Sequence, residues 1–348
     1  MPESFEVQII PICPSPFPPR KIKTRAFLLP LRRANEALCA YRNLLEKIPH
    51  PEKLLIHLRS LEAIASLSKH MAPISLAKFL TTPKKDPSMA QVRDYIRALI
   101  FSDKGVSPFS KKQICRIHKI AKKTTAPKND LGCYRNRQNW IGVKGCTIEE
   151  AYFYPPAPED VPQMMQQLFH YAKKNKKEPL LQIALVFAQL LIIHPFMDGN
   201  GRIARMWIPS FLHHKKLLPV PFFFMSHYFQ KHRFRYFLAL YNIREDQHWE
   251  EWILFFLKGF FHQANMSSRT LVKIKNIYDL LALEMPHLNQ TGRLFLFERP
   301  IFTLSAFKKT KNAVSILEEL RRKKWISRIK ERKYRFVLLL KILRKLQK

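Results

Sequence analysis

One segment of the 348-residue sequence places residues that bind phosphate and move protons close together. It reads HPFMDGNGRIAR and runs from His194 to Arg205. Gly199 and Gly201 stand two positions apart in a chain with only eight glycines. Glycine tolerates the positive φ that lets successive backbone N–H groups converge on one point. We therefore predict an anion-binding nest that opens onto the N-terminus of a helix.

The charged residues of this segment suit phosphate chemistry. Arg202 and Arg205 are three positions apart at the start of the expected helix, so they share a face and can both fork onto phosphate oxygens. Asp198 adds a carboxylate beside the nest, where a magnesium ion that bridges phosphates would bind. An imidazole such as that of His194 commonly removes a proton near neutral pH. Together these groups predict transfer of a phosphate ester to a hydroxyl.

The segment resembles the HPFx(D/E)GNGRxxR motif of the Fic (filamentation induced by cAMP) family at every defined position. Other stretches resemble further parts of that family. LGCYRNRQNWIG at 131–142 is similar to the segment before its active-site flap, and EAYFYPPAPEDV at 150–161 to the flap hairpin. SHYFQKHRFRYFLAL at 226–240 is similar to the stretch that packs by the adenine. The N-terminal region and the basic C-terminus resemble the Fic N-terminal region and an appended winged helix, so the resemblance covers essentially the whole chain.

The resemblance implies protein AMPylation, the transfer of AMP from ATP to a Ser, Thr or Tyr hydroxyl of a target protein. His194 would be the base that activates the hydroxyl, and Asp198 would hold Mg²⁺ against the α- and β-phosphates. The remaining motif residues would bind phosphate: Gly199, Asn200 and Gly201 in an anion hole, Arg202 at the β-phosphate and Arg205 at the γ-phosphate.

Two more regions receive roles through the resemblance. The flap would bind the backbone of the target by strand addition, and its candidate residues are Thr147, Tyr152, Phe153 and Tyr154. The three aromatic residues among them have an alternative interpretation as hairpin packing. Tyr236 would lie in the adenine pocket.

The sequence departs from the family at the inhibitory helix. Relatives with this N-terminal arrangement carry (S/T)xxxE(G/N), whose glutamate pairs with the second arginine of the motif. Here Ser66 begins the pattern, but His70 and Met71 stand where glutamate and glycine would be. Because no acid at that place can pair with Arg205, we expect weak or absent autoinhibition of this kind. The same change argues against the reverse, deAMPylating reaction.

The motif residues must be positioned by the surrounding elements, and in most of these the apolar residues recur with helical spacing. It predicts helices over 31–47, 52–69, 89–101, 111–123, 161–174 and 179–193. The segment 130–158 holds three glycines with β-branched and aromatic residues, which predict a short hairpin. We expect a mainly α fold, with a Fic helical core and a β-hairpin flap.

The chain is long enough for two or three compact units. We predict a proline-rich arm and Fic N-terminal helical region over 1–88, a catalytic core over 89–265, and a basic winged-helix domain over 266–348. The last of these begins with a helix over 268–283 and continues with helix, turn, helix and alternating strand. It carries 21 Lys and Arg against 6 Asp and Glu.

The net charge of the chain indicates which classes of partner it could attract. There are 61 Lys and Arg against 26 Asp and Glu, a formal net charge of +35. Such a field attracts nucleic acid, acidic proteins or anionic membranes without identifying a fold. The basic C-terminal domain therefore either binds nucleic acid or is only a solvated face. For the chain as a whole, a homodimer is a separate partner that we consider. Two other functions stay open: a nucleotide-sensing, nucleic-acid-binding regulator, and a Fic-type phosphotransferase with another donor pose.

Cysteine usage and hydropathy indicate the compartment. Five scattered cysteines without a CxxC pair favour a reducing environment. The longest apolar run, 180–193, falls short of the roughly 18 residues that cross a membrane, so we expect no membrane span. The N-terminus MPESFEVQII lacks the basic start of a signal peptide. We expect a cytoplasmic protein, with secretion as an effector as the alternative.

Overall fold

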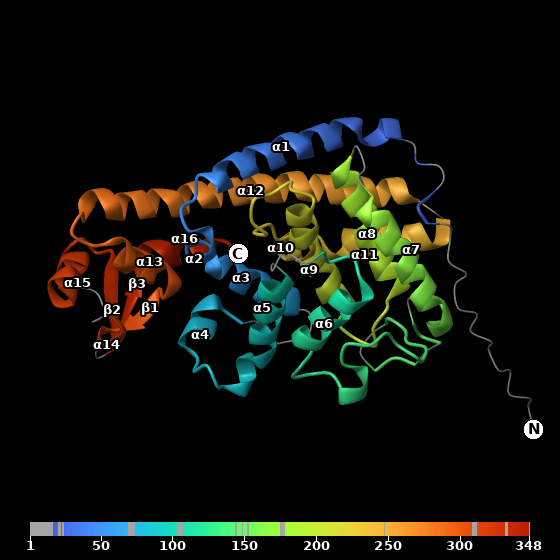
Figure 1. The fold of residues 1–348 in the computed structure, drawn as a ribbon, viewed down its shortest axis with the longest axis horizontal. Coiled ribbons are helices and arrows are strands. Elements are labelled where there is room, and N and C mark those ends of the chain that lie inside the picture. Colours follow the sequence, from blue (N-terminus) through green and yellow to red (C-terminus); the bar gives the residue numbers. More distant parts are fainter. Residues whose placement is uncertain are drawn as a thin grey trace, which may run out of the picture.

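The computed structural model describes residues 17–19, 22, 24–68, 74–102, 107–142, 145–147, 149–151, 153–174, 178–246, 248–307, 312–330 and 333–347. Within these residues the fold is mainly α, as predicted (Figure 1). The α-helices are α1 Leu28–Glu46, α2 Pro51–Leu54, α3 Ile56–Leu67, α4 Leu76–Thr81, α5 Ala90–Ser102, α6 Lys111–Ala121, α7 Val161–Lys173, α8 Pro179–Ile193, α9 Asn200–His214, α10 Ser226–Lys231, α11 Arg233–Asp246, α12 Trp249–Glu284, α13 Gln290–Glu298, α14 Leu304–Phe307, α15 Ala313–Arg322 and α16 Val337–Lys345. The strands are β1 Ile301–Thr303, β2 Ile326–Lys330 and β3 Lys333–Phe336, and short 3-10 helices occur at Thr24–Phe27, Pro87–Met89, Lys128–Asp130 and Pro158–Asp160.

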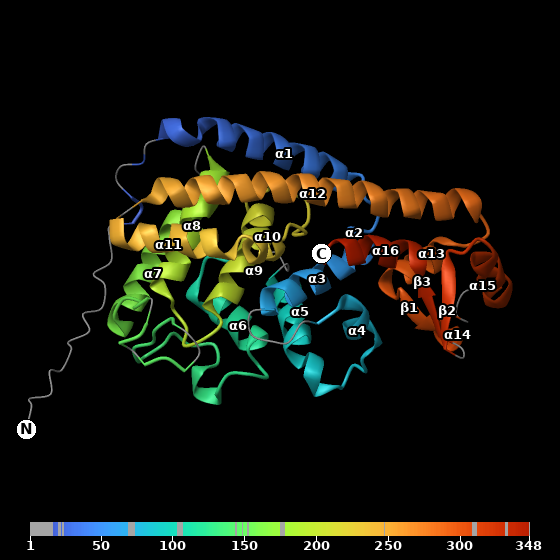
Figure 2. The same ribbon diagram turned by 180° about the vertical axis from the view of Figure 1, so that it is seen from behind.

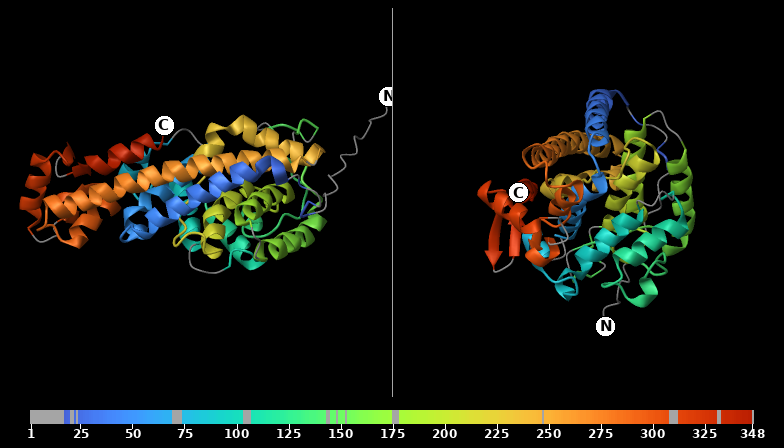
Figure 3. Two further views of the ribbon diagram at one scale, coloured as in Figure 1. Left: turned by 90° about the horizontal axis from the view of Figure 1, so that it is seen from above. Right: turned by 60° about the vertical axis from the view of Figure 1, so that its left-hand side comes forward.

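Two long helices, α1 and α12, lie side by side along one edge of the molecule (Figures 1 and 3). The apolar residues of α1 recur three or four positions apart, which puts them on one buried face. That face includes Leu31, Leu38, Tyr41 and Leu45. At 1.5 Å per residue, the 36 residues of α12 reach about 54 Å. This helix therefore runs from the end that holds α7 and α8 to the C-terminal strands (Figure 2).

α8 is the buried helix that the sequence predicts, with the same bounds. Helices α1, α7, α9 and α12 pack around it. The indole N–H of Trp252, on α12, donates to the carbonyl oxygen of Ala184 at 2.8 Å. The same indole stacks on Phe187 with ring centroids 5.6 Å apart. A helix packed on all sides is held firmly, so its C-terminal end is a fixed base for the loop that follows.

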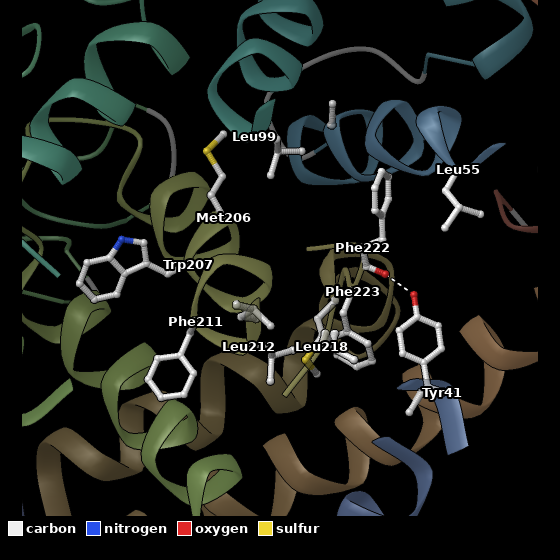
Figure 4. Close-up of a cluster of buried hydrophobic side chains, with 14 of the residues drawn as sticks. Tyr41, Leu55, Leu99, Met206, Trp207, Phe211, Leu212, Leu218, Phe222 and Phe223 are labelled. Carbon is white, nitrogen blue, oxygen red and sulfur yellow. Dashed lines mark hydrogen bonds between the residues drawn. The ribbon is translucent and has the colours of Figure 1, made fainter. Parts of the chain in front are cut away.

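α9 follows that loop and is anchored in the hydrophobic core (Figure 4). Met206, Trp207 and Phe211 of this helix are fully buried. The same cluster contains Tyr41 of α1, whose hydroxyl donates to the carbonyl oxygen of Phe222. Because the middle of α9 is fixed in the core, its N-terminal turn is also fixed in position.

The C-terminal part follows the order that a winged helix requires. Helix α13 leads into β1, α14 and α15, and then into the antiparallel pair β2 and β3. The sheet order is β1-β3-β2, with Ile301 opposite Arg335 and Ile326 opposite Phe336. A last helix, α16, returns to pack against α12 and α3. The order agrees with the predicted winged helix, and the winged-helix assignment itself stays a prediction.

The structure differs from the predicted elements at several places. The single helix predicted over 52–69 is two helices, α2 and α3, which are separated at Leu55. The predicted boundary between residues 265 and 266 falls inside α12, where we expected a new helix only from 268. Residues 263–267 contain neither proline nor glycine, so nothing interrupts the helical hydrogen bonds. Within the predicted hairpin, the described residues form one isolated antiparallel bridge, Ile141 with Phe153.

Two other expectations concern the chain's ends and its hydropathy. Residues 1–16 of the predicted proline-rich arm lie outside the described residues. Pro30 stands in the first turn of α1, where a missing N–H leaves no helical bond unmade. No helix in the described ranges is long and apolar enough to cross a membrane.

His57 lies where α3 meets the C-terminal part. Its side chain is 5% exposed, and its Nε2 is 2.9 Å from the carbonyl oxygen of Phe297. Burial lowers the pKa of His57 from 6.5 to about 4, so the folded chain holds a neutral ring that donates to Phe297. In the unfolded chain this histidine takes up a proton at a higher pH.

His57→Gln should therefore weaken the pH dependence of stability. Between pH 6.5 and about 4 the unfolded chain binds a proton at His57 that the folded chain does not. This lowers the free energy of unfolding by about 1.4 kcal/mol for each unit of falling pH. Glutamine keeps a donor for Phe297 but cannot titrate, so urea denaturation across this range should show a slope smaller by that amount. His170→Gln, at an exposed position of α7, is the control, and equal slopes in both variants would contradict the prediction.

Candidate active site

α8 ends at the start of the motif. His194 takes a left-handed conformation, with φ 50° and ψ 58°, and its backbone N–H closes the helix on the carbonyl oxygen of Leu190 at 3.1 Å. Pro195 disfavours helix at the residue before it. The Nδ1 of His194 lies 3.1 Å from the carbonyl oxygen of Leu191. A neutral ring therefore carries its proton on Nδ1, which leaves Nε2 as the basic nitrogen.

Asn200 braces the loop that follows. Its Oδ1 accepts the backbone N–H of Phe196 at 2.9 Å, and its Nδ2 donates to the carbonyl oxygen of Phe196 at 2.7 Å. The Nδ2 of Asn139 donates to the same carbonyl oxygen at 3.1 Å. Since the side chain of Asn200 is used within the loop, its predicted part in an anion hole would fall to its backbone N–H.

The two motif glycines differ, because Gly199 has a positive φ whereas Gly201 lies within the first turn of α9. Gly199 has φ +92° at the N-cap of α9, and a Cβ there would lie 3.1 Å from Cδ of Lys122. A Cβ on Gly201 would lie 3.0 Å from Nη1 of Arg205. The first N–H groups of a helix have no helical acceptor. The loop thus presents backbone donors beside two arginines, and binding of an anion by these donors stays a prediction.

Arg202 is buried beside these donors. Its residue exposure is 4%, and within the described part of the chain its Nε and Nη1 have no hydrogen-bond partner. Burial lowers the pKa of Arg202, against the opposing charge of Asp198. Leaving buried donors of a charged group unpaired costs free energy. An anion bound at the N-terminus of α9 would satisfy them.

Arg205 is held by α3. Its Nε donates to Oγ of Ser66 at 2.9 Å, and its Nη2 donates to the carbonyl oxygen of Ser66 at 3.2 Å. Ser66 is the residue that begins the degenerate inhibitory pattern, so that position contacts the second motif arginine without a glutamate. His70 lies outside the described residues.

A buried acid near Arg205 escaped the sequence analysis. Glu62, one turn before Ser66 on α3, accepts from the backbone N–H of Ser226 at 3.2 Å and from the hydroxyl of Tyr95 at 3.1 Å. Burial raises the pKa of Glu62, while Ser226 and the charge of Arg205 oppose that rise. Glu62 thus places an acid near Arg205, one turn before the residue that begins the inhibitory pattern and not at the position of His70.

His118 and Lys122, also absent from the predicted site, hold the Asp198 end of the loop. The backbone N–H of Gly132 donates to Nδ1 of His118 at 3.1 Å, so the proton is on Nε2, which donates to the carbonyl oxygen of Asp198 at 2.9 Å. The imidazole stacks on Phe196 with centroids 4.0 Å apart. Burial lowers the pKa of His118 to about 4, which keeps the ring neutral.

Lys122 pairs with the carboxylate itself. Its Nζ bonds Oδ2 of Asp198, and Oδ1 of Asp198 accepts the backbone N–H of Gly199 at 2.6 Å. The lysine side chain is 2% exposed and the aspartate side chain 59%. Burial alone would raise the pKa of Asp198, but Lys122 and Arg202 lower it to about 2. The sequence did contain a signal for this lysine, since Lys122 follows α6 directly and stands four positions after His118, on the same face of the helix.

Arg135 joins the motif loop to the base of the flap. Its backbone N–H donates to the carbonyl oxygen of Pro195 at 2.9 Å, and its Nε donates to that of His194 at 2.9 Å. Its Nη2 donates to the carbonyl oxygen of Pro156. One buried guanidinium therefore fixes the positions of both segments, a role that only the tertiary structure reveals.

The flap candidates are partly described. Phe153 exchanges backbone hydrogen bonds of 2.9 and 3.1 Å with Ile141, and its ring centroid lies 6.2 Å from that of His194. Thr147 is exposed, and its N–H donates to a carboxylate oxygen of Glu150 at 3.0 Å. Tyr154 is half-buried and Tyr152 lies outside the described residues. The structure thus brings Phe153 next to the catalytic candidate.

Tyr236 lies in an aromatic cluster. It is 6% exposed, and its ring centroid is 5.0 Å from Phe229 and 5.9 Å from Trp252. Burial raises the pKa of Tyr236 to about 12, against the charge of Arg205 and a side-chain hydrogen bond with Arg205. This placement favours packing, and contact with an adenine stays a prediction.

Gly199→Ala should destabilise the chain more than Gly145→Ala. Both glycines have a positive φ, +92° and +87°, which costs an alanine about 1 kcal/mol. A Cβ at Gly145 meets no atom within 4 Å, whereas at Gly199 it presses on Lys122, which should add roughly 1 kcal/mol. Urea denaturation of both variants measures the difference. Equal losses would mean that the contact with Lys122 contributes nothing.

Comparison with known proteins places this site in a family. Residues 108–212 match the model of the Fic/DOC family. A probable protein adenylyltransferase of Aquifex aeolicus is 28% identical over 178 residues, which are 49% of this chain and 53% of the relative. Protein adenylyltransferase Fic of Drosophila grimshawi is 38% identical over 61 residues, 17% of this chain and 13% of that protein. The alignments thus span about half of the first relative and a small part of the second.

Solved structures show the same fold. A Fic family protein from Desulfovibrio desulfuricans superposes with a TM-score of 0.62 at 17% identity, over 91% of this chain and 98% of that chain. Fic-1 from C. elegans gives a TM-score of 0.52 at 16% identity, over 71% of this chain and 73% of that chain. The residues that match the Fic/DOC family model, 108–212, contain the motif loop and the N-terminus of α9.

Proposed function

We propose that this chain transfers AMP from ATP to a Ser, Thr or Tyr hydroxyl of a target protein. The observation that carries the proposal is Arg202, buried beside the N-terminus of α9 with two donors that have no partner among the described residues. Buried cationic donors at a helix N-terminus form a binding site for phosphate. The names of the relatives support the transfer of AMP, although the first of them aligns with this chain over only 53% of its length.

The chemistry follows from the positions of the groups. Nε2 of His194 accepts the proton of the target hydroxyl, and the resulting oxygen attacks the α-phosphorus of ATP. The new P–O bond forms as the bond from that phosphorus to the oxygen bridging the β-phosphate breaks, and pyrophosphate leaves with the electron pair. The N–H groups of Gly199, Asn200 and Gly201, with Arg202, neutralise the charge that develops. The ring centroid of the flap residue Phe153 lies 6.2 Å from that of His194, so Phe153 would contact a target bound beside this base.

The resemblance also predicts Mg²⁺ at Asp198. In the structure both carboxylate oxygens of Asp198 already accept hydrogen bonds, one from Gly199 and one from the ammonium of Lys122. A metal ion bound there would have to displace Lys122 or lie against its positive charge. The residues present therefore do not fit a divalent ion at this carboxylate, and no step above passes through one.

Arg205 has a different starting position from Arg202. To reach a γ-phosphate it must exchange its bonds to Ser66 for bonds to the nucleotide, since its Nε and Nη2 are used in the described structure. We infer that the loss of these bonds to Ser66 is what hinders Arg205 from binding the γ-phosphate. We also infer that glutamate-based autoinhibition is absent.

His194→Ala should abolish transfer of label from ATP labelled at the α-phosphate, because it removes the imidazole proposed to take the hydroxyl proton. Self-modification or modification of added protein in wild type and variant provides the readout. Transfer from γ-labelled ATP would support the phosphotransferase alternative instead. Salt-sensitive DNA binding that survives in the variant, with no label transfer in wild type, would support the regulator alternative.

Ser66→Ala should raise the affinity for ATP or the rate of transfer by about fivefold, the effect of removing one competing hydrogen bond worth ~1 kcal/mol. Ser68→Ala is the matched control, because the hydroxyl of Ser68 donates to the carbonyl oxygen of Ala65 on the same helix. Calorimetric titration of both variants with ATP measures the change. An unchanged affinity and rate in Ser66→Ala would mean that Ser66 does not restrain Arg205.

A further inference from the structure

The buried ammonium of Lys122 forms an ion pair with Asp198, the only carboxylate of the motif segment. Asp198 is the single acid between His194 and Arg205. Its Oδ2 accepts a hydrogen bond from Nζ of Lys122, whose side chain is 2% exposed. The aliphatic part of the Lys122 side chain packs against Gly199, where an added Cβ would lie 3.1 Å from Cδ of the lysine. Lys122 therefore forms part of the surface of the nest.

The pair is more than a surface contact. An aspartate side chain that is 59% exposed is well hydrated and needs no partner to be stable. The lysine, in contrast, has given up its hydration to reach this position, and a buried charge requires a partner. The arrangement therefore places a permanent positive charge at Asp198 in the absence of any ligand.

The charge balance of the site opposes a second cation. Lys122, Arg202 and Arg205 surround the nest. Asp198 faces Lys122 and Arg202, and the buried Glu62 lies near Arg205. Among the described residues no group of three or more His, Cys, Asp or Glu side chains could hold a metal ion. Magnesium bound by a protein usually relies on one or two carboxylates together with phosphates. Here the one carboxylate is already neutralised.

We propose that Lys122 replaces a divalent metal at Asp198, so that the nucleotide binds to this chain without Mg²⁺. The ammonium cancels the charge of Asp198, and the phosphates then meet the backbone donors and arginines of the nest without repulsion from a carboxylate. Lys122 acts through Asp198 and is a positioning residue. The proposal rests on the proposed ATP site and defines how that site is neutralised.

The test compares nucleotide binding with and without the metal. The ligand is an ATP analogue with a methylene group between the α- and β-phosphates, which cannot be cleaved, and calorimetry measures its Kd in EDTA and in Mg²⁺. For wild type the two Kd values should agree within about threefold. In Lys122→Met, where Asp198 has lost its partner, binding in EDTA should weaken about tenfold and Mg²⁺ should restore it. Lys122→Arg, which keeps a positive charge, should behave as wild type does.

Two controls separate this role from a structural one. Lys123→Met removes the same charge from the next, exposed position and should leave both Kd values unchanged. Mn²⁺, followed by its paramagnetic resonance, should bind to Lys122→Met with the analogue more tightly than to wild type with the analogue. If Lys122→Met does not fold, as judged by thermal unfolding, then Lys122→Arg and the Mn²⁺ titration of wild type still test whether Lys122 replaces the metal.

Wild type that binds the analogue at least about tenfold more tightly in Mg²⁺ than in EDTA would overturn the proposal. So would a folded Lys122→Met that shows no gain in metal dependence, or failure of wild type to bind the analogue in either condition. These outcomes do not depend on label transfer. Loss of the proposed AMP transfer with metal-independent binding intact would refute the function and leave the role of Lys122 standing.

Discussion

Burial of positive charge at the N-terminus of α9 is the constraint on which the rest of the structure depends. Arg202 is 4% exposed with two donors unpaired among the described residues, and Lys122 and Arg205 lie close by. Such a cluster is unfavourable unless the surrounding chain holds it in place and an anion compensates it. The middle of α9 fulfils the first condition, because Trp207 and Phe211 are fixed in the core. The second condition, an anion that compensates the charge, is the one that a bound phosphate would fulfil. The nest, the basic nitrogen of His194 and the paired Asp198 are in place for that phosphate before any ligand binds.

Backbone carbonyl groups carry much of the bracing around this charge. Arg135 donates to the carbonyl oxygens of His194 and Pro156, and His118 donates to that of Asp198. Asn200 uses both ends of its amide on Phe196. Each bond is buried or partly buried, where hydrogen bonds are stronger and unpaired groups costlier than in water. The loop is thus held by side chains from α6, from the segment before the flap and from α9, and its φ values of 50° and 92° are maintained by that frame.

The helix α3 connects the site with the C-terminal part. Ser66 near its end holds Arg205, and His57 near its start contacts Phe297 of α13. α16 also packs against α3, and α12 joins the two ends of the molecule in one continuous helix. α3 is therefore a packed helix that makes one hydrogen bond to the second motif arginine near its end and another to the C-terminal part near its start.

The sequence by itself determined several of the helices and the location of the candidate site. α7 and α8 begin where periodicity predicts. The twelve motif residues predict an anion-binding nest, a base and two arginines, because these features depend on local spacing and on glycine's backbone freedom. The tertiary structure alone decided which partners they meet. Lys122 on Asp198, Ser66 on Arg205 and Arg135 on two carbonyl groups are contacts between residues 76, 139 and up to 59 positions apart. Contacts at that separation depend on how helices pack, and no local pattern of residue types encodes them. For the same reason Tyr236 has a periodicity that fits either a pocket or the core, and only packing placed it among Phe229 and Trp252.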